Sequence, residues 1–157
     1  MGRPLDAGPV RLQLDGLPSA VGAAFGPTPW LRIDQRRIDL FAEATGDHQW
    51  IHVDPVRAER SPFGGTIAHG HLTASLCSYY LPQLYVVEGA AMAVNYGSDR
   101  IRFPSPLVSG SDLRGNARIV SVDLIAGGFQ VKTEATLEPR LGTKPACVAE
   151  LITRYLR

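Results

Sequence analysis

Residues 70–81 read Gly-His-Leu-Thr-Ala-Ser-Leu-Cys-Ser-Tyr-Tyr-Leu, a run in which large and small side chains recur at helical spacing. The large ones lie three and four positions apart, at Leu72, Leu76, Tyr79 and Tyr80. This spacing predicts a helix that is mostly buried. Because most of the side chains between them are small, a sheet can wrap closely around the helix, and the rest of the chain must supply that sheet.

The second half of the chain has the alternation of long strands. Residues 129–138 alternate almost without fault, so we expect their odd positions to face the core and their even positions to face water. Less regular strands are predicted over 91–103 and 112–125, and a final strand over 145–155 is apolar on both faces, as a central strand would be. The sequence therefore predicts an α+β fold in which an antiparallel sheet covers a long central helix.

The region before the buried helix carries start and stop signals for two further helices. Asp34 is a suitable N-cap for a helix through Ala44, and Gly46 is a suitable C-cap. We expect the inward face of this helix to carry Ile38, Leu40 and Phe41. Asp54-Pro55 then predicts a helix of about two turns over 55–60.

Length and composition favour a single domain. A chain of 157 residues that is 45% hydrophobic is large enough to bury one continuous core. Residues 1–28 are rich in Gly, Pro and Ala, and we expect a loosely ordered segment there with one short helix over 17–24. The two cysteines, Cys77 and Cys147, lie in apolar runs and are expected to be reduced core residues.

Charge and hydropathy exclude several classes of partner. The net charge is +1, and Lys and Arg are scattered without a basic stripe, so nucleic acid is not expected as a partner. The first six residues lack the apolar segment of a signal peptide, and no later apolar run has the length of a membrane span. We therefore expect a cytoplasmic protein with no membrane association.

The candidate chemistry lies between residues 45 and 81, which hold all four histidines. Asp47 and His52 flank a short segment that follows Gly46, so one turn presents an acid and an imidazole together. Gly70 stands at the first turn of the buried helix, where backbone N–H groups have no partner within the helix. Such an N–H is a suitable donor for a carbonyl oxygen that gains negative charge during a reaction.

Simpler readings of these residues exist. Asp47 could serve merely to cap a turn, and His52 could be a hydrogen-bonded core histidine. Their spacing, together with the downstream Ala68-His69-Gly70, favours catalysis. A metal site could use His48 and His52 together with His69 and His71, near Asp47 and Asp54. It would require His48 and His52 on one helical face, and Gly46 breaks the helix just before them, so no metal is expected. No serine lies in the Gly-x-Ser-x-Gly pattern of a hydrolase.

The segment from Asp34 to Leu76 resembles the MaoC-like, R-specific enoyl-CoA hydratase family of hot-dog proteins. The resemblance rests on Phe41-Ala42, Thr45-Gly46-Asp47, Ile51-His52, Asp54 and Ala68-His69-Gly70, with Asn95-Tyr96-Gly97 and Arg102-Phe103-Pro104 further on. It implies a hot-dog fold that closes its open sheet edge by forming a homodimer. Where the family usually has Asn-Pro, this chain has Gln49-Trp50, which we expect to alter the range of substrates.

The resemblance also implies a reaction and its residues. In the family, water adds to C3 of a trans-2-enoyl-CoA, so that coenzyme A enters as part of the substrate and no cofactor is needed. By similarity, Asp47 and His52 hold and deprotonate the water, and the Gly70 N–H polarises the thioester carbonyl. Gln49, Ser78 and His69 would support the site, with His69 hydrogen-bonded locally to shape its loop. Candidates for contact with coenzyme A phosphates are Arg100, Arg102 and Lys144, which a solvated strand edge would explain equally well.

Two other functions fit the same resemblance. A hot-dog thioesterase would use the same fold but attack the carbonyl carbon and release a free thiol. A non-catalytic acyl-binding or partner subunit would bind acyl-CoA without turning it over.

Overall fold

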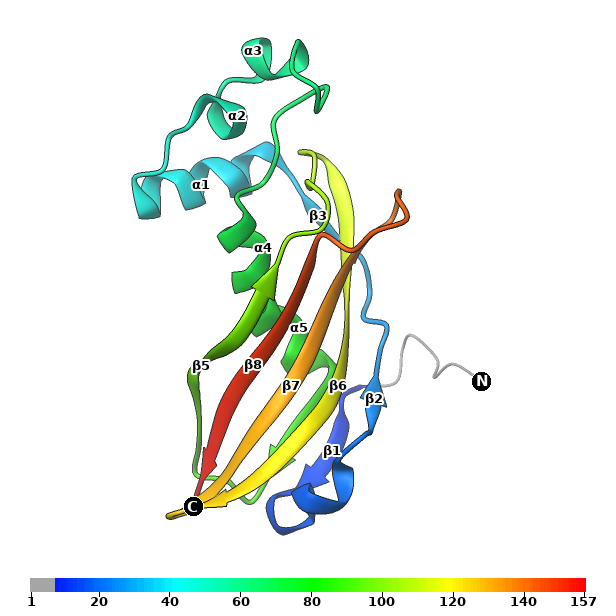
Figure 1. Ribbon diagram of the computed structural model, residues 1–157, viewed down its shortest axis with the longest axis vertical. Coiled ribbons are helices and arrows are strands. Elements are labelled where there is room, and N and C mark those ends of the chain that lie inside the picture. The colour runs from blue at the N-terminus through cyan, green and yellow to red at the C-terminus, as the bar shows by residue number, and fades with distance from the viewer. Residues whose placement is uncertain (1–7) are drawn as a thin grey trace.

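The computed structural model describes residues 8–157, in which a curved antiparallel sheet wraps around a helical segment (Figure 1). The order of the strands is β2-β6-β7-β8-β5, and β3 also pairs with β6. Their bounds are β2 Ala24–Phe25, β3 Leu31–Ile33, β5 Met92–Arg102, β6 Ser111–Ile125, β7 Gly128–Pro139 and β8 Cys147–Leu156. The predicted α+β architecture is confirmed.

The two most specific strand predictions are confirmed. In β7 the odd positions from Phe129 to Leu137 are buried, whereas the even positions between them are only partly covered. Strand β8 lies between β7 and β5, as its two apolar faces predicted. Strand β5 lies at the edge of the sheet and is exposed along almost its whole length.

The central helix consists of two segments, α4 (Gly70–Ser75) and α5 (Cys77–Leu84), instead of one continuous helix. At the junction, the Leu76 N–H is shared between the carbonyls of Leu72 and Thr73, a bifurcated bond of the kind common at helix ends. Leu72, Leu76 and Tyr80 are buried as predicted. The prediction for Tyr79 was wrong, because its side chain is 49% exposed on the outer face of α5.

The expectation of a loosely ordered N-terminal segment was wrong for residues 8–28; the first seven residues lie outside the described part of the chain. Strand β1 (Val10–Gln13) pairs in parallel with β4 (Tyr85–Glu88), and a 3₁₀ helix, η1 (Leu14–Ala20), replaces the helix expected over 17–24. The segment is held by burial: Leu14 and Leu17 pack with Ile119, Phe129 and Val131 in a second core cluster.

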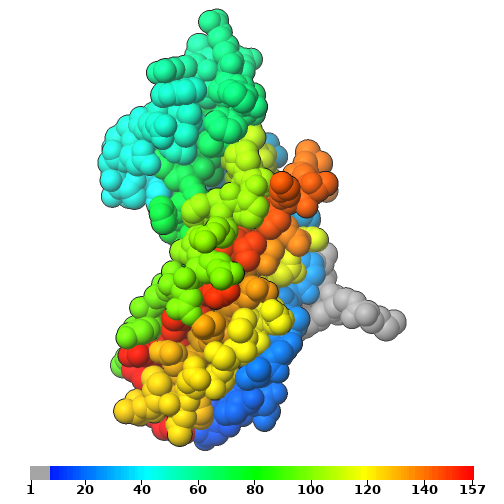
Figure 2. All heavy atoms as spheres, viewed as in Figure 1, coloured from blue at the N-terminus to red at the C-terminus, as the bar shows by residue number. Residues whose placement is uncertain are grey.

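The segment between β3 and α4 forms three short helices that stand beyond the end of the sheet, visible as a separate lobe in Figure 2. They are α1 (Gln35–Thr45), α2 (Trp50–Val53) and α3 (Pro55–Glu59). The caps are those predicted: the Asp34 and Asp54 carboxylates accept from the N–H groups of Arg37 and Arg57, at 2.9 and 3.0 Å. Gly46 ends α1 with a φ of 76°.

One inward residue of α1 was predicted wrongly. Ile38 and Ala42 are fully buried, but Leu40 is 60% exposed. At 3.6 residues per turn, positions 38 and 42 share one helix face, and position 40 points about 200° away from position 38. Because α1 projects from the body of the protein, the face that carries Leu40 meets solvent.

Both cysteines are free thiols buried in the core, as predicted. Cys77 on α5 and Cys147 on β8 are hydrogen-bonded to each other, and this bond together with burial raises the pKa of the Cys77 thiol. A thiol in that state carries little thiolate, so Cys77 is poorly suited to be a nucleophile. No helix within residues 8–157 is long and apolar enough to cross a membrane.

Candidate active site

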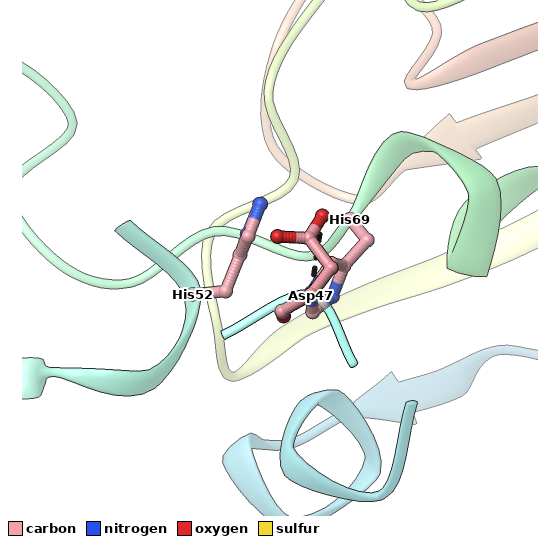
Figure 3. A group of neighbouring side chains, drawn as sticks. All are labelled: Asp47, His52 and His69. Carbon is pink, nitrogen blue, oxygen red and sulfur yellow. Dashed lines mark hydrogen bonds and ion pairs between the residues drawn. The ribbon is translucent and has the colours of Figure 1, made fainter. Parts of the chain in front are cut away.

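Asp47, His52 and His69 meet at the junction between the helical lobe and the start of α4 (Figure 3). Asp47 follows the C-cap of α1, His52 lies on α2, and His69 is the N-cap residue of α4. One carboxylate oxygen and one nitrogen from each ring lie within 4.8 Å of one another. The Asp47 side chain is 55% exposed, whereas both histidines are buried. The acid therefore faces solvent while the imidazoles are fixed within the protein.

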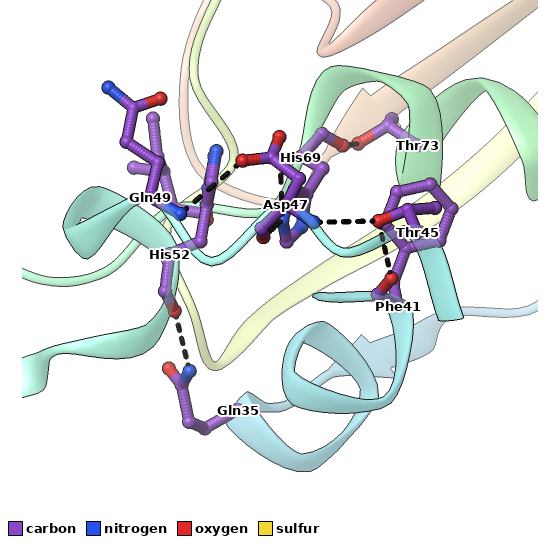
Figure 4. Close-up of polar contacts among 9 residues, drawn as sticks. Gln35, Phe41, Thr45, Asp47, Gln49, His52, His69 and Thr73 are labelled. Atoms are coloured by element: carbon purple, nitrogen blue, oxygen red, sulfur yellow. Dashed lines mark hydrogen bonds and ion pairs between the residues drawn. The ribbon is translucent and has the colours of Figure 1, made fainter. Parts of the chain in front are cut away.

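The His52 ring is held in one orientation. Its Nδ1 lies 2.6 Å from the carbonyl oxygen of Ile67. Because a carbonyl can only accept, Nδ1 must carry the hydrogen, and a neutral ring then leaves Nε2 with a free lone pair. The backbone of His52 is held as well, since its carbonyl accepts from Gln35 Nε2 at 2.7 Å (Figure 4). The geometry gives His52 the free nitrogen that a base requires.

Gln35 and the carbonyl of Ile67 are parts of the site that the sequence did not point to. Gln35 is the first residue of α1, and its side-chain oxygen also accepts a hydrogen bond from the Thr66 hydroxyl. It thereby joins α1, α2 and the segment that leads into α4. A backbone carbonyl has no sequence signature, and a glutamine near a helix start is common, so only the folded structure identifies them.

His69 is nearly inaccessible, with 3% of its surface exposed. Its Nε2 lies 2.9 Å from the backbone oxygen of Asp47, which requires Nε2 to donate, and 3.9 Å from the Asp47 carboxylate. The ring stacks on that of His52 with centroids 3.8 Å apart, and the Phe41 ring lies 5.0 Å away. The expected local hydrogen bond is in fact a bond to a loop 22 residues earlier in the chain.

Gly70 is the first residue of α4. Within residues 8–157, no acceptor pairs with its N–H, as is usual at this helix position. A Cβ atom placed on Gly70 would lie 2.8 Å from two ring carbons of Phe103, the residue that follows β5. The Phe103 ring therefore occupies the space that the side chain of any larger residue at position 70 would need.

A cavity of about 750 Å³ runs along the helical segment, between α4 and α5 on one side and β4, β5 and β8 on the other. Its lining includes His71, which follows Gly70, and Ser78 one helical segment further on. Asp47 and His52 are not part of the lining. The cavity thus reaches the start of α4 at His71, and neither the acid nor the imidazole lines it.

The remaining predicted residues do not join the group of Asp47, His52 and His69. The backbone N–H of Gln49 donates to the Asp47 carboxylate at 3.3 Å, while its side chain is exposed. Arg100 and Arg102 lie on the exposed edge strand β5, and Arg102 is next to Phe103 in the chain. The carbonyl of Lys144 accepts from the Ser105 hydroxyl, so its loop lies beside the end of β5.

Two histidines and a carboxylate are also a donor set that a transition metal could use. The nitrogen lone pairs lie in the ring planes, and the two rings are only 24° from parallel at a separation of 3.8 Å. In nearly parallel planes at this separation, lone pairs of the two rings do not converge on one ion. His48, the other residue of the metal hypothesis, is absent from the group and lies 3.9 Å from Glu43. The absence of a metal remains a prediction.

Comparison with known proteins identifies relatives along most of the chain. The family model of the MaoC like domain matches residues 17–139. The 3-hydroxyacyl-thioester dehydratase Z of Mycobacterium tuberculosis is 48% identical over 141 residues, which cover 89% of this chain and 93% of the relative. Nodulation protein N of Rhizobium leguminosarum is 44% identical and covers 90% of each chain.

A solved structure with a similar fold is the R-hydratase PhaJ1 of Pseudomonas aeruginosa in its unliganded form. It has 25% sequence identity and a TM-score of 0.70, over 87% of this chain and 82% of that one. This likeness identifies the fold as the hot-dog fold, as the sequence motifs implied. With a family model that matches more than half of its residues and relatives that align along most of its length, the chain belongs to the MaoC-like dehydratase family.

Proposed function

We propose that the protein is an R-specific enoyl-CoA hydratase, which adds water across the 2,3 double bond of a trans-2-enoyl-CoA to give an (R)-3-hydroxyacyl-CoA, and catalyses the reverse dehydration. The observation that carries the proposal is the Asp47 carboxylate beside a His52 ring whose Nε2 is free, close to the helix start that presents the Gly70 N–H. Family membership and the named activities of the relatives support the same class of reaction.

The reaction needs a base for the water, a proton source for C2 and a donor for the thioester oxygen, and we assign these roles to Asp47, His52 and the Gly70 N–H. Asp47 and His52 hold one water, and Nε2 of His52 takes its proton while the water oxygen bonds to C3. The electron pair of the double bond moves toward the thioester, and the negative charge on its oxygen is stabilised by the Gly70 N–H. Asp47 or His52 then returns a proton to C2, which completes the addition of water. Acid–base help of this kind contributes roughly 10²–10⁴-fold and one oxyanion donor roughly 10²–10³-fold, so both are required.

The cavity beside α4 and α5 is the proposed site of the acyl chain. The cavity starts one residue beyond Gly70, so an acyl chain bound along the cavity would have its thioester near the start of α4. Ser78 would line this chain, and Gln49 and Trp50 would shape the approach to Asp47. Arg100, Arg102 and Lys144 are proposed contacts for the phosphates of coenzyme A, because Arg102 and the loop of Lys144 lie near Phe103, which covers Gly70.

We propose that the protein is a homodimer joined at β5. One side of this strand pairs with β8, and its other side has no neighbour among residues 8–157. Met92, Val94 and Tyr96 on this strand are between 41 and 57% exposed. An unpaired edge strand with apolar side chains is prone to associate, and pairing with β5 of a second copy would cover it.

A hydration assay tests the proposed function. The purified protein is incubated with trans-2-enoyl-CoA substrates of increasing chain length, and the loss of enoyl absorbance is followed while the C3 configuration of the product is determined. The proposal predicts loss of absorbance and an R product without release of thiol. Free coenzyme A would instead identify a thioesterase, and tight binding without any change in absorbance would identify a non-catalytic acyl-binding subunit.

A further inference from the structure

His69 contacts both Asp47 and His52 and directly precedes Gly70, but it has no role in the reaction steps of the proposed mechanism. Its ring contacts His52, its Nε2 bonds to the backbone of Asp47, and its own backbone leads directly into Gly70. We propose that His69 is a positioning residue, which fixes both Asp47 and His52 in the geometry that the reaction requires. This inference rests on the proposed function, since it assigns a role in the same reaction.

The bond to Asp47 matters because the Asp47 loop has few other restraints. Residues 47–49 lie outside regular helix and strand, between the end of α1 and the start of α2. The Asp47 N–H has only a long bond, 3.4 Å, to the Thr45 hydroxyl, and its side chain is more than half exposed. The 2.9 Å bond from His69 Nε2 to the Asp47 carbonyl is therefore the contact that ties this loop to α4.

The stack on His52 supplies the second restraint. The bond from Nδ1 to Ile67 fixes one edge of the His52 ring but leaves rotation about that bond open. The flat face of His69, 3.8 Å away and 24° from parallel, blocks this rotation. The His69 ring is itself held by contact with the Phe41 ring and by burial, so it restricts the movement of the His52 ring.

The hydrogen bond to Asp47 decides which nitrogen of a neutral His69 ring carries the hydrogen. Nε2 carries the hydrogen that is donated to Asp47, so the neutral ring has its lone pair on Nδ1. That Nδ1 is buried without a hydrogen-bond partner among the described residues. Among the described residues, the bond to Asp47 is therefore the hydrogen bond that orients the His69 ring.

Two substitutions separate the two restraints. His69→Phe keeps a flat ring against His52 but removes the donor, whereas His69→Gln keeps an amide donor near the Nε2 position but removes the ring. We expect kcat for the hydration of crotonyl-CoA to fall about 10²-fold in His69→Phe and about 10-fold in His69→Gln, with KM within about 3-fold of the wild type, because misplaced catalytic groups slow the chemical step more than binding. Turnover in both variants within about 2-fold of the wild type would overturn the proposal.

Nuclear magnetic resonance of the same variants keeps this inference separate from the proposed function. The imidazole ¹⁵N signals of His52 should shift in His69→Gln, and the carbonyl ¹³C signal of Asp47 should shift in His69→Phe, whether or not the wild type hydrates enoyl-CoA. Unchanged signals would show that His69 positions neither residue. If one variant fails to fold, as judged by circular dichroism, the signals and kinetics of the other variant test the proposal. An inactive wild type together with shifted signals in the variants would contradict the proposed hydratase activity but support the positioning role of His69.

Discussion

The carbonyl oxygen of Ile67 lies 2.6 Å from Nδ1 of His52, and this contact decides which nitrogen of the ring is free. Ile67 is held in turn by its own N–H, which donates to the carbonyl of Ile51 at 2.9 Å. The residue before His52 and the segment before Gly70 are thereby joined through backbone atoms alone. Any change that moves one of these two segments should disturb the other.

Gln35 should be needed for full activity although it does not face the substrate. We predict that Gln35→Leu lowers kcat about 10-fold, because it removes the bonds to the His52 carbonyl and the Thr66 hydroxyl that hold α2 against the start of α4. The cost in unfolding free energy should be about 1 kcal/mol for each bond lost, measured by urea denaturation. Asp39→Ala is the matched control, because it removes the 2.8 Å bond from Gln35 Nε2 to the Asp39 carboxylate and keeps the Gln35 bonds to His52 and Thr66. A kcat loss as large in the control would contradict this explanation.

Gly70 should not tolerate a side chain. We predict that Gly70→Ala lowers kcat about 10²-fold, because the new Cβ would lie 2.8 Å from the Phe103 ring and force either the ring or the start of α4 to move the N–H that binds the oxyanion. Adding Phe103→Ala should restore part of the rate by making room. Gly65→Ala, where the nearest atom lies at 3.5 Å, provides a control that should keep wild-type turnover. Full activity in Gly70→Ala would remove the N–H from the mechanism.

The exposed edge of β5 should carry the dimer. We predict that Val94→Lys shifts the protein toward a monomer in sedimentation velocity at micromolar concentration, because a charged side chain on an edge strand opposes pairing with a second strand. Leu141→Lys changes an apolar side chain that is 89% exposed but lies in the loop between β7 and β8, and it should leave the sedimentation coefficient unchanged. A wild-type protein that sediments as a monomer would contradict the proposed dimer.

The sequence predicted best those features that depend on neighbouring residues. The N-cap acids Asp34 and Asp54 and the C-cap Gly46 act within one helical turn, and the alternation of β7 records which face is buried. The approach of Asp47 to His52 followed from their spacing around one turn. These predictions needed no knowledge of the tertiary fold.

Features that depend on distant contacts were missed. The division of the central helix at Leu76 has no counterpart in the pattern of large and small residues. The ordered N-terminal segment follows from burial of Leu14 and Leu17 against β6 and β7. The stack of His69 on His52 joins residues whose relation in the chain indicates nothing about their orientation. Such contacts arise only when the elements pack, so local patterns do not encode them.

The most direct test of the account compares crotonyl-CoA hydration by the wild type with that by Asp47→Asn and His52→Ala. Each substitution removes one of the two groups that hold and deprotonate the water, and Asp47→Asn is nearly isosteric. We predict that the wild type removes the enoyl absorbance and forms the R product, and that both variants keep their circular dichroism spectra but lose at least about 10²-fold in kcat. Wild-type turnover in either variant, or no loss of absorbance with the wild type, would contradict the assignment of the acid and the imidazole.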